Sequence, residues 1–159
     1  MELKKRKDMR LQNFDYSSQG AYFITLCTKD KKKLLGHIVE EGLCALPSIK
    51  LTQIGKKVDE GINYINNNYT GVAVDKYVIM PNHIHLIIRL ETGGDGTPPL
   101  RVCDIIGRFK SYTSYNYGEK LWQRSYYDHI IRGEMDYMEI WEYIDKNPHK
   151  WNEDELYLE

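Results

Sequence analysis

The residues that decide the fold run from Met80 to Ile88, with the sequence MPNHIHLII. Proline and asparagine are turn formers, and the apolar residues after them are typical of a β-strand. Side chains on a strand alternate between its two faces, so His83 and His85 are expected to point the same way. Imidazole is the commonest protein ligand for metals such as zinc, manganese and iron. The pair therefore indicates either a metal site on a sheet or two polar residues on a solvated face.

Outward from this stretch, strands and helices are expected to alternate. β-Branched and aromatic content predicts strands over residues 21–28, 72–80, 83–90 and 122–131, with a weaker extended segment at 34–39 that could form a small hairpin with the residues after Gly42. Apolar residues at spacings of three and four predict helices over 51–65 and 100–116, and a last helix is expected over 134–147. Thr52 or Ser48 could cap the first helix, and Pro148 is expected to end the last one.

This order of elements predicts an α+β protein. The pattern βαββαβ is that of the ferredoxin-like (RRM-like) fold, an antiparallel four-stranded sheet with two helices on one face. An additional C-terminal helix is then free to lie across the other face. The length of 159 residues fits one domain, residues 1–159, with a basic N-terminal arm at 1–19 and a flexible Gly/Pro-rich loop at 91–99.

The composition is that of a soluble globular protein, with 42% hydrophobic and 28% charged residues. No segment approaches the roughly 18 apolar residues that cross a bilayer, and the charged N-terminus does not resemble a secretory signal. Three widely spaced cysteines argue against a disulfide framework or a structural zinc site. We therefore expect a cytoplasmic protein without a membrane partner.

The charge is unevenly distributed, although the net charge is only −1. Residues 1–33 contain nine lysines and arginines against four acids. Such a basic arm can contact phosphates, but a solvated tail explains the charge equally simply. Thirteen tyrosines, many of them near basic side chains, suit stacking on nucleobases, though most tyrosines in any protein are half-buried packing residues.

The expected last helix carries a second pair of polar residues. Tyr143 and Asn147 are four residues apart, which places them on one helical face. An amide oxygen can bind a divalent cation, and a phenol can act as a nucleophile. If this helix packs over the face that bears His83 and His85, the four side chains form one site. Otherwise Tyr143 packs and Asn147 caps the helix ahead of proline.

Four stretches in order resemble a known family. Residues 80–86 are similar to the histidine–hydrophobic–histidine motif of the single-tyrosine HUH transposases, and residues 20–25, 122–132 and 143–148 match the REP-associated tyrosine transposase branch. The resemblance implies a ferredoxin-like enzyme that cleaves and rejoins single-stranded DNA. It implies that Tyr143 is the nucleophile, leaving a 5′-phosphotyrosine and a free 3′-OH. It also implies that His83, His85 and Asn147 bind Mg²⁺ or Mn²⁺; insertion-sequence relatives usually carry glutamine where Asn147 stands.

The expected partner is single-stranded or hairpin DNA, bound by a monomer or a homodimer. Basic residues are candidates for phosphate contacts near the site, although each is also explained as a solvated surface charge: Arg10, Arg108, Lys110, Arg124 and Arg132. His129 is a candidate accessory group, with a structural role as the alternative.

Two other functions remain open from the sequence. A ferredoxin-like sheet with exposed aromatic residues can bind single-stranded nucleic acid without cleaving it. A metal-dependent hydrolase could instead use water as its nucleophile. That reading is weakened because no carboxylate ligand is evident in the sequence pattern.

Overall fold

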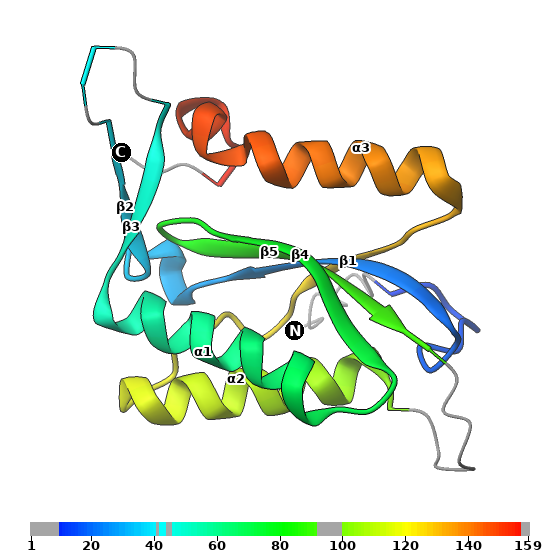
Figure 1. Ribbon diagram of the computed structural model, residues 1–159. Coiled ribbons are helices and arrows are strands. Elements are labelled where there is room, and N and C mark those ends of the chain that lie inside the picture. The colour runs from blue at the N-terminus through cyan, green and yellow to red at the C-terminus, as the bar shows by residue number, and fades with distance from the viewer. Residues whose placement is uncertain (1–9, 41, 44–45, 92–99, 157–159) are drawn as a thin grey trace, which may run out of the picture.

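The computed structural model describes residues 10–40, 42–43, 46–91 and 100–156. A four-stranded antiparallel sheet lies between two layers of helices (Figure 1). Its strands are β1 (Gly20–Cys27), β4 (Val72–Ile79), β5 (His83–Leu90) and β6 (Tyr127–Ile130). Their spatial order, β4-β5-β1-β6, is the order that the βαββαβ connectivity requires. The predicted α+β fold is therefore confirmed.

β4 and β5 form a hairpin, in which β4 is an edge strand and β5 is one of the two central strands. The turn at residues 80–82 reverses the chain, and the Met80 N–H donates to the His83 carbonyl at 2.8 Å. β1 then pairs with β5 along its whole length, with Cys27 opposite His83 and Thr25 opposite His85. This antiparallel register brings β1 side chains next to the two histidines, because directly opposed residues share a sheet face.

Two helices cover one face of the sheet: α1 (Gln53–Asn68) and α2 (Val102–Tyr117). Thr52, and not Ser48, caps α1, since its hydroxyl accepts the Gly55 N–H at 3.1 Å. Ser48 instead begins β3 (Ser48–Leu51), which pairs with β2 (Gly36–Val39) in the small hairpin expected from the sequence. The main apolar core lies between α1, α2 and the sheet.

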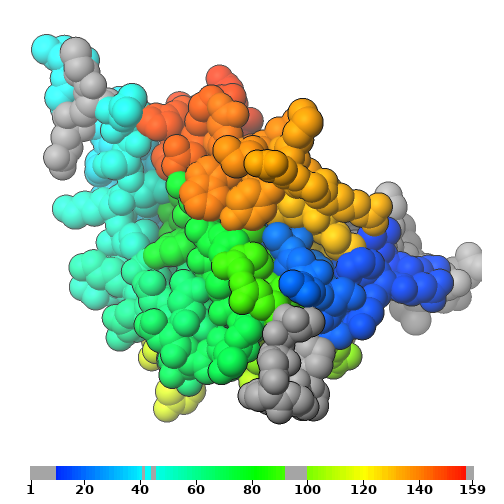
Figure 2. Space-filling model, turned by 45° about the vertical axis from the view of Figure 1, so that its right-hand side comes forward, coloured from blue at the N-terminus to red at the C-terminus, as the bar shows by residue number. Residues whose placement is uncertain are grey.

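The last helix, α3 (Gly133–Lys146), lies across the opposite face of the sheet. Figure 2 shows its orange residues packed over the green residues of β4 and β5. The expectation that Pro148 stops the helical chain was only partly right. The α-helix ends at Lys146, but the chain continues as a 3₁₀ helix, η2 (Asn147–Glu153). Proline is tolerated at the first positions of a helix, where its missing N–H has no partner to lose.

The fourth strand is much shorter than the predicted segment 122–131. Trp122 forms only an isolated bridge with Thr28, and its buried indole donates to the Thr113 hydroxyl at 2.7 Å. Its apolar character therefore reflects packing under α2 and not a place in the sheet. A second short 3₁₀ turn, η1 (Lys29–Lys31), follows β1.

Part of the predicted basic arm (residues 1–9) and most of the predicted loop (residues 92–99) lie outside the described residues. Cys27 and Cys103 are free thiols, and Cys44 also lies outside the described part. Among the described helices none has the length and apolar character needed to span a membrane.

Candidate active site

Two buried histidines on β5 form the centre of the site. His83 is 0% exposed and His85 is 3% exposed, and their Nε2 atoms lie 3.1 Å apart. The other nitrogen of each ring is in hydrogen-bond contact. His83 Nδ1 lies 2.8 Å from the Asn82 Oδ1, and His85 Nδ1 lies 2.8 Å from the Thr25 Oγ1. The alternation of β5 therefore points both Nε2 atoms at the same spot, as predicted.

The partners of His83 fix its tautomer. The amide nitrogen of Asn82 donates to the carbonyls of Lys31 and Leu156, at 3.2 and 2.7 Å. Asn82 Oδ1 must therefore accept the proton of His83 Nδ1, which leaves Nε2 with a free lone pair. Burial lowers the pKa of His83 to about 4, against the opposing charge of Asp154. The neutral imidazole that results is the form that binds metal ions.

Burial also holds the pKa of His85 well below its ordinary value, with His83 as a second cause. Two neutral imidazoles whose Nε2 atoms face each other can share at most one hydrogen bond, and only if one ring has the Nε2–H tautomer. With both Nδ1 atoms protonated, two lone pairs converge instead. A cation between them would remove that repulsion, because each lone pair could then coordinate it.

Two oxygen atoms complete this cluster. Asp154 Oδ2 lies 3.5 Å from His83 Nε2, and the side chain is 4% exposed. The ligand atoms of Asp154 and the two histidines all lie within 4.8 Å of one another. Asn147 is 3% exposed and lies close enough to His83 to influence its pKa. Within the described part of the chain, Asp154 Oδ2 and Asn147 Oδ1 are buried without a hydrogen-bond partner.

Asp154 Oδ1 accepts the Leu156 N–H at 2.8 Å, but a buried carboxylate oxygen without a partner is costly, and so is an unpaired amide oxygen. Both are ligand types that Mg²⁺ and Mn²⁺ accept, and imidazole adds affinity for Mn²⁺. The donor set therefore fits a divalent cation. Asp154 is the residue that the sequence reasoning missed, and it supplies the carboxylate that seemed absent. Only the acidic run at 153–155, shortly after Asn147, could have suggested it.

Tyr143 stands beside this cluster on α3. Its ring lies 5.2 Å from the His85 ring, centre to centre, and meets the Phe23 ring edge-on at 6.0 Å. The side chain is 48% exposed, so its hydroxyl is within reach of a ligand. Burial and the charge of Asp154 raise the pKa of the phenol above its ordinary value of 10. Without a nearby cation Tyr143 is therefore protonated at neutral pH.

Contacts along α3 hold Tyr143 in this place. Ile144, the one buried residue of α3, packs on Phe23 and Ile87 from the sheet. The Tyr137 hydroxyl donates to Asp75 on β4 at 3.0 Å. Farther along, Lys76 pairs with Asp145 at 2.7 Å. The structure thus brings Tyr143 and Asn147 together with His83 and His85, as the helical spacing suggested.

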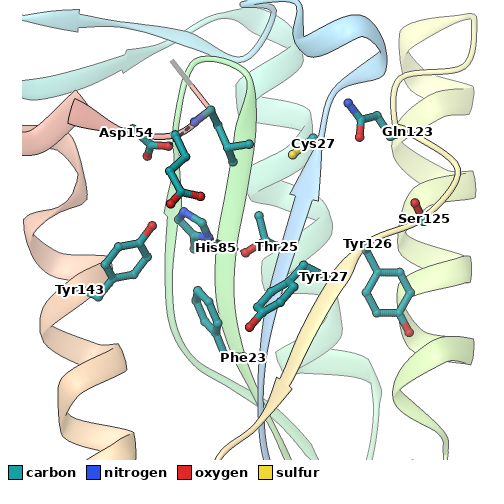
Figure 3. Close-up of a pocket in the computed structure, with 12 residues that line it drawn as sticks. Phe23, Thr25, Cys27, His85, Gln123, Ser125, Tyr126, Tyr127, Tyr143 and Asp154 are labelled. Atoms are coloured by element: carbon teal, nitrogen blue, oxygen red, sulfur yellow. Dashed lines mark hydrogen bonds between the residues drawn. The ribbon is translucent and has the colours of Figure 1, made fainter. Parts of the chain in front are cut away.

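A pocket of about 460 Å³ opens in front of His85 (Figure 3). Its floor is the sheet, with Phe23, Thr25 and Cys27 from β1. Tyr143 and the chain after η2 form one side, and the segment 123–127 forms the other. A phosphodiester placed over His85 would therefore have Tyr143 on one side and a polar, aromatic wall on the other.

Three of the predicted DNA-contacting residues lie near this wall. The Arg10 guanidinium lies 5.0 Å from the centre of the Tyr126 ring, which lines the pocket. Lys110 donates to the carbonyls of Gln123 and Arg124, at 2.6 and 3.0 Å. Its ammonium therefore holds the wall in place, whereas Arg124 itself is exposed. Their contacts with DNA remain predictions.

The other candidates lie apart from the pocket. Arg108 stands over the Tyr69 ring, in the layer of α1 and α2 on the opposite sheet face. Arg132 is exposed just before α3. His129 Nε2 lies 2.9 Å from an Asp136 carboxylate oxygen, so it joins β6 to the first turn of α3. That contact supports a structural role for His129, because it ties down the helix that carries Tyr143.

Comparison with known proteins gives a consistent picture. The family model "Transposase IS200 like" matches residues 16–147. An uncharacterized protein of Haemophilus influenzae is 35% identical over 175 aligned positions, which cover 97% of this chain and 94% of that protein. A solved REP-associated tyrosine transposase bound to a REP hairpin superposes with a TM-score of 0.65. That match covers 89% of this chain and 74% of the other, at 22% identity, and it is a likeness of fold.

Proposed function

Because the chain belongs to the IS200-like transposase family, we propose that it is a metal-dependent nuclease and strand transferase for single-stranded DNA, with Tyr143 as the nucleophile. The observation that carries the proposal is the meeting of Tyr143 with the buried histidine pair, at 5.2 Å between the rings of Tyr143 and His85. The fold likeness to a transposase that holds a REP hairpin supports hairpin DNA as the substrate.

The reaction moves one phosphate between two oxygens. Tyr143 Oη attacks the phosphorus, the bond from phosphorus to the 3′-oxygen breaks, and the phosphate stays on tyrosine as a 5′-phosphotyrosine. The phenol is half-exposed, so its proton can pass to water, and the departing 3′-oxygen takes up a proton to become a hydroxyl. Attack by a 3′-hydroxyl on the phosphotyrosine reverses these steps, so joining needs no other energy source.

His83, His85, Asn147 and Asp154 would hold the Mg²⁺ or Mn²⁺ ion. When bound, the ion supplies a Lewis acid for the phosphate and a positive charge that favours the phenolate. The chain's own residues do the rest. Asn82 and Thr25 orient the two imidazoles, and the apolar contacts of Ile144 fix the height of Tyr143 above the sheet.

The test is a covalent-adduct assay. Hairpin DNA with a randomised single-stranded flank is incubated with the protein and Mn²⁺, and a DNA-linked band is sought on a denaturing gel. Tyr143→Phe should abolish the adduct, whereas Tyr115→Phe, at an exposed tyrosine of α2, should leave it unchanged. Labels on the two DNA ends show which end is attached to the protein.

Three outcomes would contradict the proposal. An adduct that persists in Tyr143→Phe would remove Tyr143 as the nucleophile. Tight DNA binding with neither adduct nor cleaved product would instead favour a non-catalytic binding protein of this fold. Cleavage without an adduct, retained in Tyr143→Phe, would indicate hydrolysis by water.

A further inference from the structure

The pocket wall opposite Tyr143 is built from parts that no step of the reaction uses. Gln123, Ser125, Tyr126 and Tyr127 form this wall, which faces Tyr143 across the sheet floor (Figure 3). The Tyr127 ring is 49% exposed and meets the Phe23 ring edge-on at 6.4 Å. The wall therefore combines an accessible aromatic face with an amide and a hydroxyl, the groups that read an unpaired nucleobase.

The wall is held rigidly before any substrate binds. The Gln123 N–H donates to the Cys27 carbonyl at 2.9 Å, and the Gln123 carbonyl accepts from Lys110 at 2.6 Å. The neighbouring Trp122 is 1% exposed and anchored under α2. In the part of the chain that the structure describes, the side chains of Gln123 and Ser125 make no hydrogen bond of their own. Backbone contacts thus fix the wall and leave these polar groups available for a ligand.

The direction of the reaction decides which nucleotide meets this wall. In an in-line displacement the leaving oxygen lies on the side of phosphorus opposite the nucleophile. Since Tyr143 attacks from the α3 side, the departing 3′-oxygen points toward residues 123–127. That oxygen belongs to the nucleoside on the 5′ side of the cut. The volume of about 460 Å³ suits such a unit, within the range of roughly 300–1,000 Å³ for small-ligand sites.

We propose that this pocket selects the base on the 5′ side of the cut, with Tyr127 stacking on the unpaired base and Gln123 hydrogen-bonding its edge. The inference rests on the proposed function for its choice of nucleotide. A glutamine amide offers an N–H donor and a carbonyl acceptor, and these groups match the adjacent donor and acceptor on the edge of an unpaired base, whose order differs between A or C and G or T. The residues that set the cleavage sequence then lie just before β6, at Gln123, and at its first residue, Tyr127, and not on the basic arm.

The closing experiment uses the full-length protein and the hairpin DNA of the adduct assay, after the cut has been mapped by sequencing. The base on the 5′ side of the cut is varied to all four bases and to an abasic site. An abasic site there should slow adduct formation about tenfold or more, because stacking is lost. An abasic site on the 3′ side of the cut serves as the matched DNA control and should have a much smaller effect.

Protein variants assign the two roles. Tyr127→Ala should reproduce the loss seen with the abasic site, while Tyr127→Phe keeps the ring and should retain most of the rate. Gln123→Ala should flatten the preference among the four bases without abolishing the adduct at Tyr143. A base preference that is the same in Gln123→Ala as in the original protein would overturn the proposal, and so would equal effects of the two abasic sites.

A binding measurement separates this inference from the proposed function. Tyr143→Phe protein is titrated with hairpin DNA carrying an abasic site at each position of the flank in turn. An abasic site at one position of the flank should weaken binding much more than an abasic site elsewhere. With Tyr127→Ala introduced into the same protein, the abasic sites should all weaken binding to a similar degree. This measurement needs no cleavage. Equal affinities for all the abasic DNAs would therefore contradict the base pocket even if the adduct forms. If no adduct forms but one abasic position still weakens binding strongly, the proposed function is contradicted and the base pocket is not.

Discussion

The two faces of the sheet differ in what they bury. On one face, α1 and α2 cover a continuous apolar core that includes Ile84, Leu86 and Ile88 of β5. On the other face, α3 buries a single residue, Ile144, over a small cluster with Phe23. Strand β5 contributes to both faces, because its alternate residues are all apolar on the first face and include His83 and His85 on the second. Stability is therefore concentrated on the first face, which frees the second for polar groups and a substrate pocket.

The largest expected difference between the faces concerns apolar packing. Leu86→Ala removes a side chain that is 1% exposed in the main core and should cost about 2–5 kcal/mol of unfolding free energy. Ile140→Ala makes a similar deletion in the half-buried packing of α3, and we expect less than about 2 kcal/mol. Urea unfolding followed by circular dichroism measures both. Equal costs would show that α3 is as firmly packed as α1 and α2.

The polar cluster should show opposite effects with and without a metal ion. Asp154→Asn removes a buried carboxylate charge, so the ion-free protein should become more stable, by on the order of 1–3 kcal/mol. Mn²⁺ at about 100 times its dissociation constant should stabilise the original protein by about 2.7 kcal/mol, and the variant much less.

Thermal unfolding with EDTA or Mn²⁺ measures this difference. Glu40→Gln, at an exposed acid, serves as the charge-matched control and should change neither value. If Asp154→Asn destabilises the ion-free protein and still gains fully from Mn²⁺, then Asp154 is a structural residue and not a ligand.

A pair of tyrosines offers the smallest and most specific comparison. Tyr77 donates to Asp59 on the α1 side at 2.6 Å, and Tyr137 donates to Asp75 from α3 at 3.0 Å. Tyr77→Phe and Tyr137→Phe should each cost about 1–2 kcal/mol, because each removes one hydrogen bond to a carboxylate. Only Tyr137→Phe should also slow adduct formation, since it loosens the helix that positions Tyr143. Equal rates of adduct formation in the two variants would show that activity does not depend on the Tyr137 contact between α3 and the sheet.

The sequence predicted most of the fold because its signals were local. The apolar run after the Pro-Asn turn predicted β5, spacings of three and four predicted α1 and α2, and the element order left few sheet topologies. The length of the fourth strand was overestimated because Trp122 is buried by packing in the core and not by pairing in the sheet. Apolar content alone does not distinguish these two reasons for burial.

The candidate site was predicted in part. His83 and His85 share a face by strand geometry, and Tyr143 and Asn147 share one by helix geometry, so each pair follows from spacing alone. Asp154 was missed because it follows a 3₁₀ helix that ends in extended backbone, where no simple period relates it to Asn147. Lys110 was taken as a phosphate contact, and only the structure shows its ammonium on the carbonyls of the pocket wall.

The sequence by itself determined which side chains share a face within each element, because backbone geometry fixes that relation over a few residues. It also determined the family resemblance, which the match over residues 16–147 bears out. Only the tertiary structure decided that α3 lies on the histidine face, that η2 carries Asp154 into the same cluster, and that a polar wall stands opposite Tyr143. Those relations join residues far apart in the chain, and packing between elements sets them, not local spacing.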